Sequence, residues 1–313
     1  MSTLTPTRPD LPVDRAVAVL RHHGRSFYFA GQLLGGRDFE RSARLYAFCR
    51  WLDDLVDEGH PALARRYLDR VRRDLALRRP SSRNVADFLA LSEDCDIPLS
   101  AALDLLDGLE QDLGHVRLED WDELVRYAYR VAGTVGLMMS QVLGARETAA
   151  RPFAIDLGIA MQLTNIARDV REDAEADRRY LPASWVGEIE PVDLRRCPKR
   201  VGAACRKMLG RAETYYDSGL SGLSYLPLRP ALAIGVAGRV YRQIGRRMLA
   251  RGANPLAGRT IVPTWQKCLL TPPSVIRQLM RDDPGDHDLR LHEPLAGLDS
   301  QAPPVVATSS RHE

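Results

Sequence analysis

Apolar residues recur along this chain at the three- and four-residue spacing of amphipathic α-helices. The spacing predicts helices at residues 13–23, 25–30, 37–58, 61–79, 84–92, 98–114, 121–144, 152–175, 195–223, 229–251 and 274–281. No segment of useful length alternates apolar and polar positions as a half-buried β-strand does. The sequence therefore predicts an all-α protein.

Glycine and proline mark where these helices end. Gly59, His60 and Pro61 form a stop signal between two of the predicted helices. From about residue 282 onward the chain is rich in Pro, Asp and Ser and has few apolar pairs. We therefore expect a single domain over residues 13–281, with flexible termini at 1–12 and 282–313.

The predicted helix at residues 152–175 carries a narrow polar stripe. At about 100° per residue, Gln162, Asn165, Asp169 and Asp173 fall on one line along the helix. Apolar residues cluster about a quarter-turn away, so the stripe borders a packed surface instead of facing water directly. Such a stripe is a place where a helix can hold a ligand.

A second stripe lies on the predicted helix at residues 37–58, where Tyr46, Arg50, Asp53 and Asp57 flank the apolar face. Aspartates at i and i+4 have Cβ atoms about 5–6 Å apart. Two such charges repel by roughly 3 kcal/mol at an effective dielectric constant of about 20. Two aspartate pairs beside apolar faces are therefore costly unless cations lie between them. Oxygen ligands of this kind suit Mg²⁺, which keeps several waters and shares its coordination shell with substrate phosphate.

Two glycines interrupt the predicted helix at residues 121–144. Gly133 and Gly136 together cost about 2 kcal/mol of helix propensity. We expect them to serve close packing or a kink beside a cavity.

Composition narrows the class of protein. The chain has 313 residues, 45% of them hydrophobic and 27% charged, which is typical of a globular protein. The formal charge of +3 is too small to indicate nucleic-acid binding, and no Lys/Arg run is interleaved with aromatic residues. No apolar stretch reaches the ~18 residues of a transmembrane helix, and the N-terminus is not a signal peptide. The 5 cysteines form no C-x-x-C pair, which favours reduced thiols and a cytoplasmic location.

Four segments resemble the squalene and phytoene synthase family, and within it the bacterial phytoene synthases. They are residues 23–30, 45–57, 127–136 and 160–182, within a resemblance that covers roughly residues 13–280. The aspartate-rich segments are specific, because two D-x-x-x-D stripes occur with their flanking residues and in the right order. The resemblance implies an all-α, single-domain fold of the isoprenoid synthase type, a helical bundle around a central cavity. It also implies a prenyltransferase that depends on Mg²⁺, with Mn²⁺ as a substitute.

The resemblance also implies residue roles. The metal ligands would be Asp53, Asp57, Asn165, Asp169 and Asp173. The catalytic residues would be the four aspartates together with Tyr129. Substrate contacts would come from His23, Arg25, Ser26, Tyr46, Arg50, Gln162, Asn165, Arg168, Arg178, Tyr180, Tyr241 and Arg259. Simple ion pairs with neighbouring aspartates are the alternative for the arginines, a structural role is the alternative for His23, and a place in the ordinary core is the alternative for Tyr241.

The chain departs from the family pattern at one place. Many relatives have a Ser-Lys pair after the late arginine, whereas this chain has Thr264 and Trp265, with Lys267 two positions later. This departure puts in doubt any role for a lysine there.

An apolar chamber would supply the rest of the chemistry, because carbocations survive only where water is excluded and aromatic faces stabilise them. Candidate wall residues are Phe27, Phe29, Val135, Leu137, Met138, Met139, Ile159 and Leu163. The same spacing is equally typical of plain core.

By this resemblance we expect head-to-head condensation of two C20 geranylgeranyl diphosphates to phytoene, the hydrocarbon precursor of carotenoids. The path would run through a cyclopropylcarbinyl (prephytoene) diphosphate and release diphosphate without NADPH. The oily product suggests peripheral contact with the inner face of the membrane and a downstream carotenoid-pathway enzyme as a partner.

Three alternatives remain open. The same chemistry on C15 farnesyl diphosphate would give dehydrosqualene, or squalene if NADPH reduces the intermediate. A head-to-tail elongating prenyltransferase also uses two aspartate-rich motifs, although Asn165 and the ending Tyr180-Leu181-Pro182 argue against it. A non-catalytic assembly factor of the same fold would have lost acidic ligands that are present here.

Overall fold

The computed structural model describes residues 13–57, 59–253 and 284–298, and helices make up most of this part of the chain. Its only extended pairing there is an isolated bridge between Arg117 and Arg179. The predicted all-α class is confirmed.

The helices of the first half are α1 (Val13–His23), α2 (Arg25–Gly31), α3 (Gly36–Asp57), α4 (Pro61–Leu77), α5 (Arg83–Cys95) and α6 (Leu99–Gln111). Those of the second half are α7 (Trp121–Ala128), the π-helical turn η1 (Tyr129–Gly133), α8 (Thr134–Val142), α9 (Ala150–Glu175), α10 (Ala183–Val186), the 3₁₀ turn η2 (Pro191–Arg196), α11 (Pro198–Ser221), the 3₁₀ turn η3 (Gly222–Tyr225), α12 (Leu228–Ala250) and the 3₁₀ helix η5 (Leu289–Leu295). The predicted helix at residues 274–281 lies outside the described residues.

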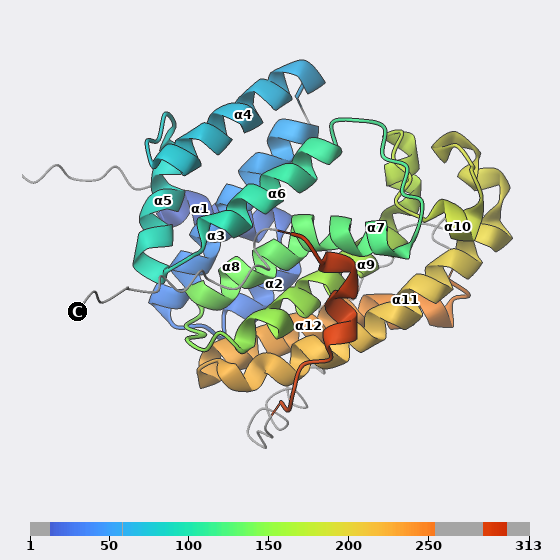
Figure 1. The fold of residues 1–313 in the computed structure, drawn as a ribbon. Helices are drawn as coiled ribbons and strands as arrows, with labels where there is room; N and C mark the ends of the chain where they lie inside the picture. The colour runs from blue at the N-terminus through green and yellow to red at the C-terminus, as the bar shows by residue number, and fades with distance from the viewer. Residues whose placement is uncertain (1–12, 58, 254–283, 299–313) are drawn as a thin grey trace, which may run out of the picture.

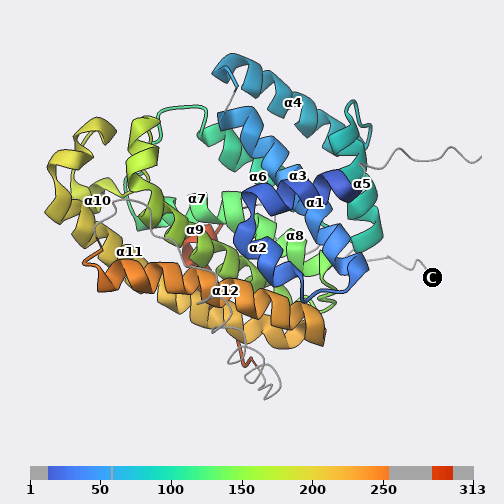
Figure 2. The same ribbon diagram turned by 180° about the vertical axis from the view of Figure 1, so that it is seen from behind.

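Helix α9 is the centre of the bundle (Figures 1 and 2). It packs against α11 and α12 on one side and against η1 and α8 on the other. Helix α3 lies on the far side of α8 and α6, and α4 forms the outer edge. The two aspartate-bearing helices, α3 and α9, therefore belong to one continuous core.

Local sequence explains where these helices begin and end. His60 caps α4 through its Nδ1, which accepts a hydrogen bond from the amide of Ala62 at 3.3 Å, and Pro61 follows at the first turn. Ser82 and Asp120 cap α5 and α7 by accepting from backbone amides. The predicted stop signal between α3 and α4 is confirmed.

Two glycines let α8 and α9 approach at main-chain distance. A Cβ added to Gly136 would lie 2.2 Å from the carbonyl oxygen of Ala154, and one added to Gly158 would lie 2.3 Å from that of Ala132. The expectation of close packing at Gly136 is confirmed. The π-helical turn η1 directly precedes this contact.

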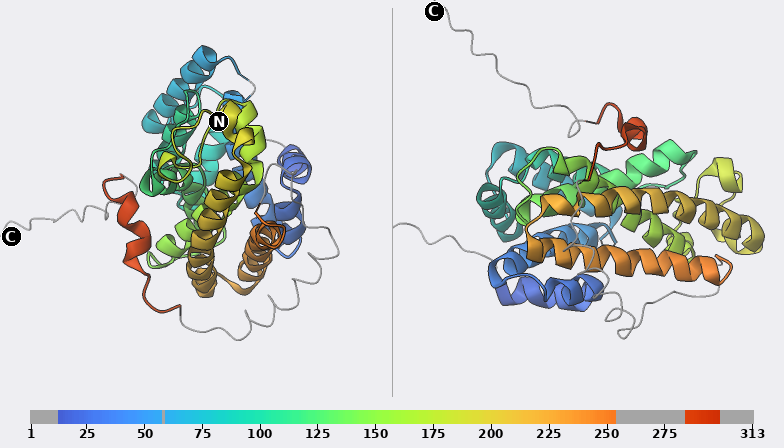
Figure 3. Two further views of the ribbon diagram at one scale, coloured as in Figure 1. Left: turned by 90° about the vertical axis from the view of Figure 1, so that its right-hand side faces the viewer. Right: turned by 90° about the horizontal axis from the view of Figure 1, so that it is seen from below.

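The segment at residues 284–298 differs from the loose tail that the composition suggested. Leu295 is 1% exposed, the Arg126 guanidinium donates to the carbonyl of Pro294, and the Tyr215 hydroxyl donates to the carbonyl of Leu291 at 2.9 Å. The segment lies across α7, α9 and α11 (red in Figures 1 and 3). Its attachment uses backbone carbonyls and two histidines, so a count of apolar pairs misses it. Residues 1–12 lie outside the described part of the chain.

No helix in the described ranges is long and apolar enough to cross a membrane.

Replacing Gly136 or Gly158 with alanine should destabilise the protein strongly. The new methyl group would overlap a backbone carbonyl that cannot move aside, and overpacking of this kind costs about 1–3 kcal/mol or more. Chemical denaturation followed by circular dichroism measures the loss.

Gly210→Ala is the matched control. Gly210 also lies within a helix, but a Cβ there meets nothing within 4 Å. This variant should gain about 0.4–1 kcal/mol because the unfolded chain loses freedom. Equal effects at Gly136 and Gly210 would contradict the close contact.

Candidate active site

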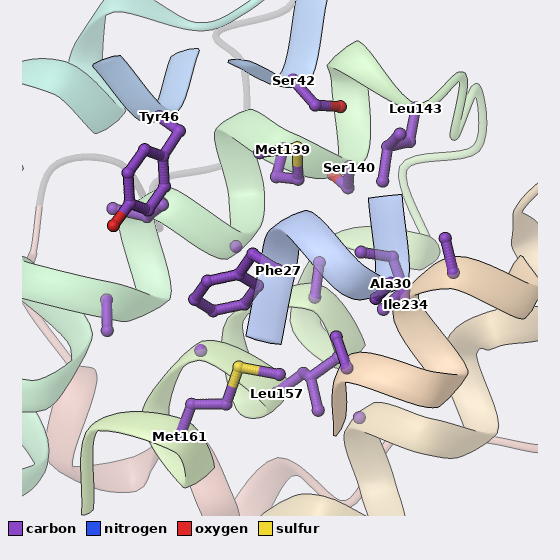
Figure 4. Close-up of a pocket in the computed structure, with 18 of the residues that line it drawn as sticks. Phe27, Ala30, Ser42, Tyr46, Met139, Ser140, Leu143, Leu157, Met161 and Ile234 are labelled. Carbon is purple, nitrogen blue, oxygen red and sulfur yellow. The ribbon is translucent and has the colours of Figure 1, made fainter. Parts of the chain in front are cut away.

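A cavity of about 330 Å³ runs between α2, α3, α8, α9 and α12. Figure 4 shows part of its wall, which is apolar along most of its length, with Phe27, Met139, Leu157 and Met161 among the lining residues. It follows α9 from Ala150 to Asn165, which corresponds to about 22 Å at 1.5 Å per residue. Its volume is typical of a small-molecule site.

One end of the cavity is polar. Its lining there comes from the two predicted stripes, with Tyr46, Arg50 and Asp53 from α3 and Gln162 and Asn165 from α9. The structure thus brings together residues more than a hundred positions apart in the sequence.

The carboxylates at this end resist ionisation. Burial raises the pKa of Asp53 to about 7, and the neighbouring charges of Asp57 and Asp112 act in the same direction. Burial likewise raises the pKa of Asp173 to about 8, with the charge of Asp169 as the next cause. Arg50 and Arg178 oppose these two shifts without cancelling them. The site holds more carboxylate than its own side chains neutralise.

Three contacts tie α3, the end of α6, α7 and the chain after α9 together. The Arg178 guanidinium donates to Asp57 at 3.1 Å. The hydroxyls of Tyr180 and Tyr127 donate to the two oxygens of Asp112 at 2.8 and 2.9 Å. The Asp112 charge raises the pKa of both Asp53 and Asp173, so this carboxylate lies near one aspartate of each stripe. Burial raises its own pKa to about 6.

Asp112 and Tyr127 are site residues that the sequence reasoning missed. Asp112 directly follows the last residue of α6 and has no second acid three or four residues away. It is therefore not part of a polar stripe that the sequence could reveal. The only signal is its place at a helix end inside the resembling region of the chain.

Tyr129 does not take its expected catalytic place. Its side chain is fully buried, its hydroxyl donates to Asp104 at 2.9 Å, and it is not among the residues that line the cavity. Tyr127, two positions earlier, contacts the acidic cluster instead. Two residues two positions apart on a helix point to nearly opposite sides, so only one of the two tyrosines can face the acidic cluster.

Two of the expected substrate-binding arginines form ion pairs with nearby aspartates, which is the alternative role for them. Arg168 donates through Nε to Asp169 at 2.7 Å, and Arg50 pairs with Asp54 one turn away. Tyr241 lines the cavity and stacks on Phe27, with ring centroids 5.1 Å apart.

The junction of α1 and α2 lies against Tyr46. A Cβ on Gly24 would come within 2.9 Å of the Tyr46 ring, so the backbone of this junction packs directly on it. The expected substrate contacts His23, Arg25 and Ser26 flank this glycine, and none of the three is in the cavity lining. Arg259, Thr264, Trp265 and Lys267 lie outside the described residues.

The expected wall residues divide into two groups. Phe27, Val135 and Met139 line the cavity, whereas Phe29, Leu137, Met138, Ile159 and Leu163 do not. Four of the second group are fully or almost fully buried core residues: Leu137, Met138, Ile159 and Leu163.

The donor set of the polar end fits a divalent cation. Asn165 Oδ1 is buried and has no hydrogen-bond partner among the described residues, and it lies one turn before Asp169 on α9. The carboxylates of Asp53, Asp57, Asp169 and Asp173 could complete with it an all-oxygen set of the kind that hard cations prefer. A bound cation would accept coordination from the unpaired amide oxygen of Asn165 and would also offset the repulsion among the carboxylates.

A family model described as squalene/phytoene synthase matches residues 20–266. The chain is 37% identical over 262 residues to a 15-cis-phytoene synthase of Enterobacter agglomerans, covering 79% of this chain and 89% of that protein. It is 39% identical over 263 residues to a phytoene synthase of Thermus thermophilus, covering 81% and 89%.

Two solved structures share the fold. A dehydrosqualene synthase in complex with ligand superposes with a TM-score of 0.76 at 24% identity, covering 86% of this chain and 96% of that one. A squalene synthase from Alicyclobacillus acidocaldarius superposes with a TM-score of 0.69 at 20% identity, covering 78% and 95%. The predicted isoprenoid synthase type of bundle is confirmed.

Replacing Asp173 with asparagine should stabilise the metal-free protein at pH 8. The pKa of Asp173 is raised from 3.8 to about 8, so the native state keeps a proton that the unfolded chain has lost. Stability therefore falls as the pH rises from about 4 to 8. The variant lacks this loss, so its thermal midpoint should exceed that of the wild type by a few degrees at pH 8, and the difference should shrink toward pH 5.

Thermal melts in a chelator between pH 5 and 8 measure the effect. Asp69→Asn, on the exposed side of α4, is the control and should leave the pH dependence unchanged. An Asp173→Asn curve parallel to the wild-type curve would contradict the raised pKa.

Proposed function

The chain belongs to the squalene and phytoene synthase family, and we propose on that premise that it joins two geranylgeranyl diphosphates head to head to give phytoene. The observation that carries the proposal is that polar residues of both aspartate-bearing helices, Asp53 of α3 and Asn165 of α9 among them, line one end of a long apolar cavity. The relatives named as phytoene synthases support the C20 substrate and a place in carotenoid biosynthesis.

We infer that the cation is Mg²⁺, held by Asp53, Asp57, Asn165, Asp169 and Asp173, with Mn²⁺ as a substitute of similar oxygen preference. When bound, it would supply positive charge to the departing diphosphate. Binding requires ionised carboxylates, so the protons held by Asp53 and Asp173 near neutral pH would be released.

The cationic side chains would then exchange partners. Arg168 and Arg178 pair with Asp169 and Asp57 in the free protein. Once those carboxylates turn to a cation, the two guanidinium groups become available to the diphosphate oxygens, which they match as planar forks. The arginines of these two ion pairs would thus become substrate contacts.

The buried tyrosines would act as donors. Burial raises the pKa of Tyr46 and of Tyr180 far above neutrality, so both keep their hydroxyl protons. A neutral hydroxyl can donate to an anionic oxygen without adding negative charge to the site. Tyr180 also holds Asp112 in place.

The apolar length of the cavity would protect the cations. As the first diphosphate leaves with the C–O electron pair, the allylic cation adds to a double bond of the second molecule. Loss of a proton then gives the cyclopropylcarbinyl diphosphate, whose own ionisation, rearrangement and deprotonation give phytoene. The stacked rings of Phe27 and Tyr241 present aromatic faces to this chemistry. The released diphosphate is the proton acceptor in this scheme.

The apolar product supports two further expectations. We propose peripheral contact with a membrane surface, and hand-over of the product to a downstream carotenoid-pathway enzyme.

Pure protein with Mg²⁺ and geranylgeranyl diphosphate should form phytoene without NADPH. Asp169→Asn should lower the rate by at least about 100-fold, because one charge partner of the transition state is lost. Mass spectrometry of the hydrocarbon identifies the product, and Asp69→Asn is the matched control with an exposed aspartate.

Other outcomes would replace the proposal. A C30 hydrocarbon made only from the C15 diphosphate would indicate dehydrosqualene synthesis, and a strict NADPH requirement would indicate squalene synthesis. Full activity in Asp169→Asn would remove the role of the second stripe.

Replacing Ala154 with phenylalanine should shift the substrate preference toward the C15 diphosphate. Ala154 lines the cavity 11 residues before Asn165 on α9, or about 16 Å from the polar end. A benzyl group there would block the deep part of the chamber. The ratio of kcat/KM for the C20 and C15 substrates should fall at least about 10-fold, by analogy with the 1–3 kcal/mol that one misfitting group costs.

Ala76→Phe, on the exposed side of α4, is the control for this substitution. Equal loss with both substrates in Ala154→Phe would mean that depth at this point does not set the chain length.

A further inference from the structure

A second polar cluster lies on the opposite side of α9 from the cavity. Asp156 is fully buried, and each of its carboxylate oxygens contacts one imidazole: His287 Nε2 at 2.8 Å and His292 Nε2 at 2.8 Å. The Ser218 hydroxyl donates to the same carboxylate. The two histidines belong to the segment at residues 284–298, which lies across the bundle in Figures 1 and 3.

This cluster is separate from the diphosphate site. Asp156 is 13 residues before Asp169 on α9, or about 20 Å along the helix axis. Its neighbours Leu157 and Gly158 line the cavity, whereas Asp156 does not. The proposed reaction uses none of its three residues.

The histidines are held in position by contacts of their own. The Phe153 ring meets the His287 ring edge-to-face, with centroids 5.3 Å apart. Tyr215 fixes the backbone of Leu291, next to His292, through a hydrogen bond. The His287 and His292 side chains are 7% and 13% exposed, so both imidazoles are taken out of bulk water. The cluster is organised before any ligand arrives.

The negative charge of the buried carboxylate is hydrogen-bonded but has no fixed positive charge beside it in the part of the chain that the structure describes. Within the described residues, the only ion-pair partners of the buried Asp156 carboxylate are the two histidines, neither of which carries a fixed charge. Burying a carboxylate without a cation is costly.

We propose that Asp156, His287 and His292 bind a transition-metal ion of the zinc class. One carboxylate oxygen and two imidazole nitrogens are a common three-ligand set for Zn²⁺, with water at the fourth position. The three ligand atoms lie within 4.8 Å of one another. Tetrahedral ligands about 2.0 Å from Zn²⁺ are about 3.3 Å apart. The imidazole that contacts the coordinating oxygen at 2.8 Å would move away from it by about 0.5 Å, and the other imidazole, which contacts the second carboxylate oxygen, would turn to the ion.

The ion would fasten the C-terminal segment to the outer side of α9. The carboxylate comes from the centre of the bundle and the imidazoles from a segment more than 130 residues later. A single bound ion would thus close a long loop and back the helix whose other side forms the cavity wall. Its role is structural, and it is independent of the Mg²⁺ proposed for the diphosphate end.

The metal content of the full-length protein tests the proposal. The protein is prepared without a histidine tag, incubated with excess Zn²⁺, desalted and analysed by inductively coupled plasma mass spectrometry. We expect one tightly held Zn²⁺ per chain in the wild type and in Asp169→Asn, and none in His292→Ala. With Co²⁺ in place of Zn²⁺, the wild type should show the visible absorption of a tetrahedral site.

His22→Ala is the matched control, because His22 is an exposed histidine on α1. It should keep the ion. Zn²⁺ should raise the thermal midpoint of the wild type and of His22→Ala by several degrees, and should leave that of His292→Ala unchanged. His292 is the partly exposed ligand, so circular dichroism of that variant checks that the bundle remains folded.

Two results would overturn the proposal. Either the wild type retains less than about one-tenth of an equivalent of Zn²⁺ after desalting, or His292→Ala retains as much as the wild type. In the first case the cluster is only a hydrogen-bonded clasp for the segment. In the second case the ion binds elsewhere on the chain.

Discussion

Repulsion among carboxylates gathered at one end of an apolar cavity is the constraint on which this structure depends. Asp53, Asp112 and Asp173 each hold a proton more tightly than a free aspartate does, because burial and neighbouring charges oppose ionisation. A helical bundle gains no stability from such a cluster when it is empty. Under the proposed function, this cost would be offset when a cation and an anionic ligand bind together, which would make the site selective for that pair.

Helix α9 connects this site to the rest of the molecule. One side of it carries the polar stripe and the cavity wall, and another side packs on α11. Its position is fixed on the α8 side by main-chain contacts and on the far side by the cluster around Asp156. The reacting end, the apolar chamber and the attached C-terminal segment therefore share one rigid element.

The helices and the two polar stripes could be predicted from the sequence, because both follow from the helical spacing of apolar and polar residues. The helix at residues 13–23 begins and ends where the spacing places it. The sequence was not sufficient for Asp112, a single acid that joins the site only through the fold. The role of Tyr129 was expected from the resemblance, which does not show that its hydroxyl meets Asp104 in the core while that of Tyr127 meets Asp112. The packing of residues 284–298 was missed for a similar reason, because its anchors are backbone carbonyls and paired side chains with no periodicity.

The main-chain contact between α8 and α9 has a consequence for how this scaffold can change. Gly136 and Gly158 leave no room for a larger residue, so that seam between the two helices is locked against substitution. Descendants of this protein that accept longer or shorter chains would have to reshape the chamber from the facing helices, α2, α3 and α12, or from the alanines beside the seam. We therefore expect the residues of this contact to vary little among related proteins, and the chamber residues on the facing helices to vary more.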